Sequence, residues 1–169
     1  MGLRLKILSG FLILSVMLFA AGALSIYELT KIGRSVQTLL DENYKSINAA
    51  KNMIEALERE DSGMLLLLSG ERERGGTTIG KADKDFQAAF QVAKNNVTIS
   101  GESDYIAAIM DAYRIYRALW NQPITRAAKD GDLNWYFKEV HPAFWDAKNE
   151  VKRLMGLNDQ TLYKTASML

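Results

Sequence analysis

The segment EREDSG contains three carboxylic acids within four consecutive positions, close enough together to suggest acid–base chemistry: Glu58, Glu60 and Asp61. Two carboxylates exchange protons with a substrate only when they converge on a pocket that holds it. The surrounding residues follow a helical pattern, and nothing in the sequence places a pocket beside them. We therefore interpret Glu58 and Glu60 as part of a solvated charged face, and we expect this chain to contain no catalytic domain.

Asp61 does not fit that interpretation, because it lies at helical spacing from Leu57 and Met64 on an apolar stripe. A buried carboxylate needs a partner or a raised pKa. A later helical segment offers Arg114 and Arg117, so we predict an ion pair between Asp61 and one of these arginines. Two alternatives remain: a partly solvated position near the end of a helical bundle, and direct contact with a ligand.

The two arginines are interleaved with aromatic residues, at Tyr113, Tyr116 and Trp120. Guanidinium groups bind carboxylates and phosphates through paired hydrogen bonds, and they also pack against aromatic faces. This cluster is therefore a candidate site for a small carboxylate or phosphate ligand. Core packing is the alternative explanation for the aromatic residues.

Two further motifs carry little weight. The segment GGTTIGK, residues 75–81, matches the glycine and lysine positions of a phosphate-binding loop, but Ala82 follows where Ser or Thr is needed to hold magnesium. We interpret it as a connecting loop. His141 is the only histidine and precedes Pro142, so we predict a residue at a helix bend. We expect no metal and no cofactor, because the chain has no cysteine and no second histidine.

Composition favours long helices and argues against a nucleic-acid partner. The 169 residues are 48% hydrophobic and 24% charged, with only two prolines. Arg4 and Lys6 are the only charged side chains before Glu28, so residues 28–169 carry 19 basic and 20 acidic side chains. That balance lacks the basic surface of a nucleic-acid-binding protein.

Residues 7–27 form an uncharged segment long enough to span a bilayer. We predict a retained transmembrane helix, with residues 1–6 as a short cytoplasmic tail and residues 28–169 as an extracytoplasmic domain, because basic residues favour the inner side. A cleaved signal peptide is the alternative, although its apolar region usually covers only about 7–15 residues. The predicted location is the inner membrane of a bacterium, with most of the chain in the periplasm.

Four amphipathic helices are predicted, which favours an all-α, up-down-up-down four-helix bundle whose first helix continues from the transmembrane helix. The first runs from about residue 25 to 69, with an apolar stripe at positions 29, 32, 36, 40, 43, 47, 50, 54, 57, 61, 64 and 68. A loop covers residues 70–80, and the second helix runs from about 81 to 97. The third begins after Ser100 or Gly101 and ends near Pro123 or at residues 129–131. The fourth begins after Asp132, bends near Pro142 and has Phe137 and Val140 on its inner face.

Asn43 and Asn158 interrupt the apolar stripes of the first and last helices. Polar residues at such positions can fix helix register or oligomeric state. We predict that they face each other within the bundle or across a homodimer.

Helix lengths suggest that the natural protein is longer. At 1.5 Å per residue, the fourth helix returns to roughly 20 Å from the membrane and then stops. We expect about a dozen further residues and then a second transmembrane helix, with tilt of the bundle as an alternative way to close the gap.

Four segments in series resemble the sensor region of bacterial transmembrane histidine kinases, most closely the KinB-like group: NYKSINAAKNMIEALEREDSGMLLLLSG, NNVTISGE, YFKEVHPAF and LNDQTLYKTAS. This group commonly has an Asn-Gln pair where the chain has Asn158-Asp159-Gln160. The resemblance implies a dimeric helical-bundle input domain of a two-component system, acting on a response regulator through a cytoplasmic part. The alternatives are the input domain of a chemoreceptor or cyclic-dinucleotide enzyme, and a membrane-anchored adaptor bundle.

Overall fold

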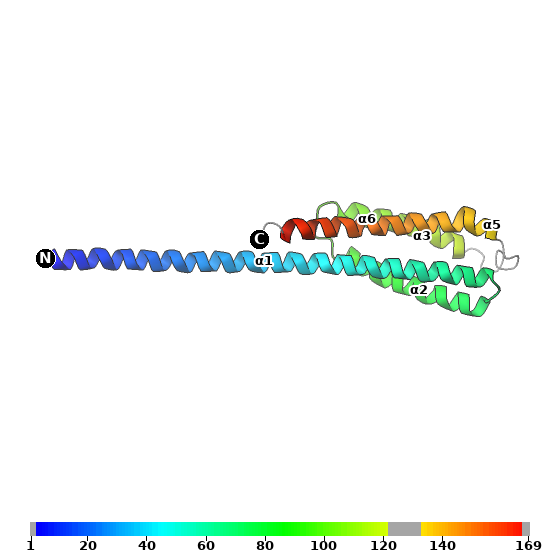
Figure 1. Cartoon of the computed structure of the whole chain (residues 1–169), viewed down its shortest axis with the longest axis horizontal. Coiled ribbons are helices and arrows are strands. Elements are labelled where there is room, and N and C mark those ends of the chain that lie inside the picture. The colour runs from blue at the N-terminus through cyan, green and yellow to red at the C-terminus, as the bar shows by residue number, and fades with distance from the viewer. Residues whose placement is uncertain (1–2, 122–132, 167–169) are drawn as a thin grey trace. The chain divides into compact units, whose positions relative to one another are not determined.

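The computed structural model describes residues 3–121 and 133–166, and all of its regular structure is helical (Figure 1). Helix α1 spans Leu3–Leu68, α2 spans Arg72–Lys94 and α3 spans Glu102–Asn121. The last helical arm is continuous and consists of α5 (Leu133–Trp135), a π-helical turn η1 (Tyr136–Val140) and α6 (His141–Ala166). These arms form the predicted all-α, up-down-up-down four-helix bundle. The predicted features at residue 123 and residues 129–132 lie outside the described residues.

Helix α1 contributes to two compact units, one ending at Leu40 and one beginning at Asp41. In the first unit, the side chains of the apolar segment are exposed, and this segment is long and apolar enough to cross a membrane, with a mean hydropathy of 2.4. Because α1 has no break, the candidate membrane span and the first helix of the bundle are one element, as predicted.

The buried face of α1 differs from the predicted stripe by one residue in its second half. Met53, Glu60 and Leu67 are buried, whereas Asp61 is only partly buried. Both runs alternate three- and four-residue steps and share positions 43, 50, 57 and 64, but the buried face takes positions 46, 53, 60 and 67, whereas the predicted stripe takes 47, 54, 61 and 68. The prediction that Glu60 is solvated is therefore wrong.

The connection between α1 and α2 is much shorter than the predicted loop at residues 70–80. The chain turns at Gly70, whose φ of +96° suits glycine, and α2 has begun by Arg72. The other glycines of this segment are helical, and Gly75 lies against Gly63 of α1. A Cβ atom on Gly75 would lie 2.8 Å from the Gly63 carbonyl oxygen, so the two backbones meet because neither residue has a side chain.

The π-helical turn η1 corrects the predicted inner face of the last arm. Tyr136 and Val140 are buried, whereas Phe137 is 60% exposed. Pro142 has no backbone N–H to donate to the carbonyl of Lys138, and the extra residue in the π turn rotates the preceding side chains relative to α6. A π-helical turn therefore precedes His141 and Pro142, and the predicted bend at these residues stays a prediction.

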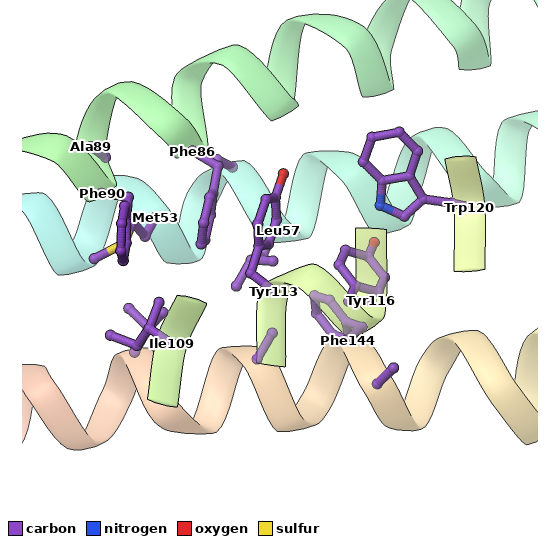
Figure 2. Packing of buried hydrophobic residues seen from close by; sticks show 14 of the residues in the cluster. Met53, Leu57, Phe86, Ala89, Phe90, Ile109, Tyr113, Tyr116, Trp120 and Phe144 are labelled. Carbon is purple, nitrogen blue, oxygen red and sulfur yellow. The ribbon is translucent and has the colours of Figure 1, made fainter. Parts of the chain in front are cut away.

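Aromatic rings from α2, α3 and α6 fill the middle of the bundle (Figure 2). Phe86 and Tyr113 stack with ring centroids 3.7 Å apart, and Tyr116 packs against Phe144 at 6.1 Å. The expectation that the aromatic residues of α3 pack in the core is confirmed for Tyr113, Tyr116 and Trp120, each at most 5% exposed. This core fixes the positions of the polar groups described next.

Candidate functional site

A chain of polar contacts joins α1 to α3 and then α3 to α2. The hydroxyl of Tyr113 lies 2.6 Å from Oε1 of Glu60 and 2.7 Å from Oδ1 of Asp83. The other oxygen of Asp83 accepts a hydrogen bond from Nη2 of Arg117 at 2.9 Å. Gln87 also donates to Asp83, at 2.8 Å. We call Glu60, Tyr113, Asp83 and Arg117 the carboxylate relay.

The relay must hold more protons than its tyrosine supplies. Tyr113 has a single hydroxyl proton and two carboxyl groups within hydrogen-bonding distance, so it can donate to only one of them. Burial of Glu60, reinforced by the negative charge of Asp83, raises the pKa of Glu60 to about 8. Burial and the nearby Glu60 also raise the pKa of Tyr113 well above its ordinary value. At neutral pH, Glu60 therefore carries a proton and donates to Tyr113, which donates to Asp83 beside Arg117.

Asp61 belongs to a second polar chain, and its predicted pairing with an arginine is corrected. The hydroxyl of Tyr136 donates to Oδ1 of Asp61 at 2.8 Å and lies 3.2 Å from Nδ1 of His141. Trp145 donates to Nε2 of the same imidazole at 3.0 Å, so the hydrogen bonds run in one direction from Trp145 through His141 and Tyr136 to Asp61. Burial, then the Asp61 carboxylate, raises the pKa of Tyr136, which keeps this donor protonated.

The predicted arginines lie at a groove between α2 and α3. The groove has a volume of about 390 Å³ and is lined by residues that include Phe86, Phe90, Met110 and Tyr113, with Arg114 and Arg117. Three of the predicted ligand-binding residues therefore share one surface: Tyr113, Arg114 and Arg117. Arg114 itself makes an exposed ion pair with Asp111 at 3.3 Å.

Trp120 lies beside this surface, and Asp61 is bonded elsewhere. The guanidinium carbon of Arg117 is 6.0 Å from the centroid of the Trp120 ring, at the outer limit of a cation–π contact. The indole nitrogen is buried and has no hydrogen-bond partner among the described residues. The structure thus groups Trp120 with Arg117, and it separates both from the polar chain that holds Asp61.

Asn43 and Asn158 lie in the interior of one chain's bundle. Each is at most 1% exposed, so neither offers a surface to a second copy. The amide of Asn158 donates to Oε1 of Glu102 at 2.8 Å, while Oε2 of Glu102 accepts from the backbone N–H groups of Thr98 and Ile99. Neither polar atom of the Asn43 side chain has a partner within the described structure. No hydrogen bond joins the two asparagines within the described structure, and their role in helix register or in a homodimer stays a prediction.

The sequence alone did not identify Glu60, Asp83, Tyr136 and His141 as members of polar chains. A signal for Glu60 was available: Leu57 and Met64 are three and four residues from it and Met53 is seven, so a helical wheel can include position 60 on the buried face. No comparable signal existed for Tyr136, because the π turn that buries it depends on the three-dimensional structure. Asp83 became visible only when its contacts with Tyr113 and Arg117 were known.

Comparison with known proteins assigns the chain to a family. Neither the search of curated proteins nor the search of solved structures found a match. One family model, described as a four-helix-bundle sensory module for signal transduction, matches residues 1–162. Because that match covers almost the whole chain and agrees with the observed bundle, this protein belongs to the family of four-helix-bundle sensory modules for signal transduction.

Proposed function

We propose that this sensory module is the extracytoplasmic input domain of a membrane-bound sensor histidine kinase. The observation that carries the proposal is the continuity of α1, which brings Glu60 of the carboxylate relay and the candidate membrane span into one helix. A signal that changes the packing of the bundle around α1 would shift the population of helix positions, and an unbroken helix can pass that shift across a membrane.

In this proposal, the natural protein continues through a second membrane helix into a cytoplasmic kinase, forms a homodimer and acts on a response regulator. The input is an unidentified small molecule or anion. The kinase assignment draws on the resemblance of four sequence segments to KinB-like sensors. The input domain of a chemoreceptor agrees equally well with the family match. The input domain of a cyclic-dinucleotide enzyme, or a membrane-anchored adaptor, is a further alternative.

A phosphorylation assay on the full-length natural protein tests the proposal. The protein is reconstituted in nanodiscs and incubated with ATP, and the acid-labile phosphate of phosphohistidine is measured. Phosphohistidine, transferable to a response regulator, is the expected result. If the full-length protein forms no phosphohistidine and instead controls a separate kinase or makes a cyclic dinucleotide, the kinase assignment is wrong. Cross-linking of the same sample tests the homodimer.

A further inference from the structure

Resting on the proposed sensory function, we propose that the groove between α2 and α3 binds a small aromatic carboxylate, whose carboxylate group pairs with Arg114 and Arg117. The volume of about 390 Å³ falls within the range of small-molecule sites. The occupant would be a small flat molecule with one acidic group, because the lining combines aromatic and apolar side chains with two guanidinium groups.

The apolar part of the groove suits a flat ring. Phe86 and Phe90 are stacked, with their ring planes 9° apart, and Tyr113 lies nearly parallel to Phe86 at 13°. Figure 2 shows the rings of Phe86 and Tyr113 face to face. Met110 is 43% exposed, and its flexible thioether makes favourable contacts with aromatic rings. Because the three rings are themselves buried, a ligand ring would contact their edges and the exposed thioether of Met110.

The charged part of the groove suits one carboxylate. One amino group of Arg117 donates to Asp83, and the Nε atom of Arg117 has no partner among the described residues. Among the described residues, Arg114 contacts only Asp111, in an ion pair that is exposed on both sides and therefore weak. Each guanidinium has five N–H donors, so both retain donors for a planar carboxylate.

The same contacts explain how occupancy would reach α1. A ligand carboxylate on Arg117 competes with Asp83 for the guanidinium and weakens the pairing of Asp83. Asp83, whose charge is then less compensated, accepts more strongly from the Tyr113 hydroxyl, and the contact between this hydroxyl and Glu60 of α1 changes with it. Tyr113 also contributes to the lining of the groove, so one side chain contacts both the ligand and the buried carboxyl of α1.

Calorimetric titration of the full chain in nanodiscs tests this inference with four probes: benzoate, indole-3-acetate, benzamide and inorganic phosphate. We expect at least one of the two aromatic carboxylates to bind, and benzamide and phosphate to bind at least tenfold more weakly. Arg117→Gln and Arg114→Gln should each weaken binding of that carboxylate at least tenfold. Met110→Trp, which fills the groove from its exposed side, should abolish it. Arg153→Gln is the matched control, because Arg153 lies on α6 away from this groove.

Circular dichroism shows whether each variant is folded, so lost binding in a folded protein can be assigned to the groove. The inference is overturned if neither aromatic carboxylate binds, if phosphate binds equally well, or if the folded arginine variants bind like the unaltered chain. It is also overturned if Met110→Trp changes the oligomeric state, because the groove would then be a contact between copies. None of these results affects the phosphohistidine assay, which tests the proposed function separately.

Discussion

The position of one proton determines how Glu60 and Asp83 share the Tyr113 hydroxyl. A protonated Glu60 donates, and the direction of hydrogen bonding then runs from α1 toward α2. An ionised Glu60 can only accept, and it would then compete with Asp83 for the single hydroxyl proton. The buried carboxyl is therefore sensitive both to pH and to events at Asp83.

This arrangement predicts a pH dependence of stability that belongs to Glu60. Its folded-state pKa of about 8 lies above its ordinary value of 4.5, so the folded chain holds an extra proton between these values. The contribution of Glu60 to the free energy of unfolding is therefore largest below pH 4.5. This contribution falls by up to about 1.4 kcal/mol per pH unit as the pH rises toward 8. Chemical unfolding in nanodiscs from pH 5 to 8 should show a shallower slope for Glu60→Gln. Glu55→Gln, on the exposed face of α1, should keep the slope of the unaltered chain.

Removal of the Tyr136 hydroxyl should destabilise the bundle, because Asp61 loses the donor that lies 2.8 Å away. We expect Tyr136→Phe to cost about 1–3 kcal/mol in the free energy of unfolding, the usual range when a largely buried polar group loses its partner. The neighbouring Phe137 is largely exposed, and Phe137→Leu should change that energy by no more than about 0.5 kcal/mol. Equal effects of the two substitutions would contradict the assigned roles of these residues.

The two buried asparagines should respond in opposite directions to the same substitution. Asn43 is buried without a partner among the described residues, so Asn43→Leu removes an unsatisfied group and should raise the midpoint of urea unfolding. Asn158 donates to Glu102, so Asn158→Leu should lower that midpoint. A loss of stability in both variants would mean that Asn43 has a partner and is not an unsatisfied group.

Among the elements, the crossing of α1 and α2 depends on the absence of side chains. Gly75→Ala places a Cβ atom 2.8 Å from the backbone of α1 and should destabilise the bundle by about 1–3 kcal/mol. Gly76→Ala is the control in the same turn, because no atom lies within 4 Å of its Cβ position. In that position, alanine should stabilise the helix by about 0.5–1 kcal/mol. The thermal unfolding midpoints of the two variants test this prediction. A higher midpoint for Gly75→Ala than for the unaltered chain would contradict a close crossing of the two helices.

The helical periodicity of the sequence was sufficient to predict the number and order of the helices, because each helix carries an apolar face. It was not sufficient to predict which residues of α1 are buried in its second half. There the buried carboxyl belongs to Glu60 and not to Asp61. It also missed the π turn that buries Tyr136. The first error arises because positions 60 and 61 both continue a regular run of three- and four-residue spacings, so spacing alone does not decide between them. The second arises because a π turn adds a residue to the rotation of the helix.

On the scale of the whole molecule, the family match and the long apolar helix together describe a sensory module with a candidate membrane span. The sequence singled out Tyr113, Arg114 and Arg117 of α3, which line one groove, and their role in ligand binding stays a prediction. It could not indicate the groove, because α2 supplies the facing wall. The central claim is that binding in this groove is transmitted to α1.

Distance measurement by pulsed electron paramagnetic resonance tests that claim most directly. Spin labels are placed on the full chain in nanodiscs at two exposed positions, Asn48 on α1 and Asp104 on α3. The distance distribution is recorded with and without a saturating aromatic carboxylate that titration has shown to bind. We predict that the ligand shifts the distribution in the unaltered chain and leaves it unchanged in Arg117→Gln. An identical distribution with and without bound ligand in the unaltered chain would contradict the claim.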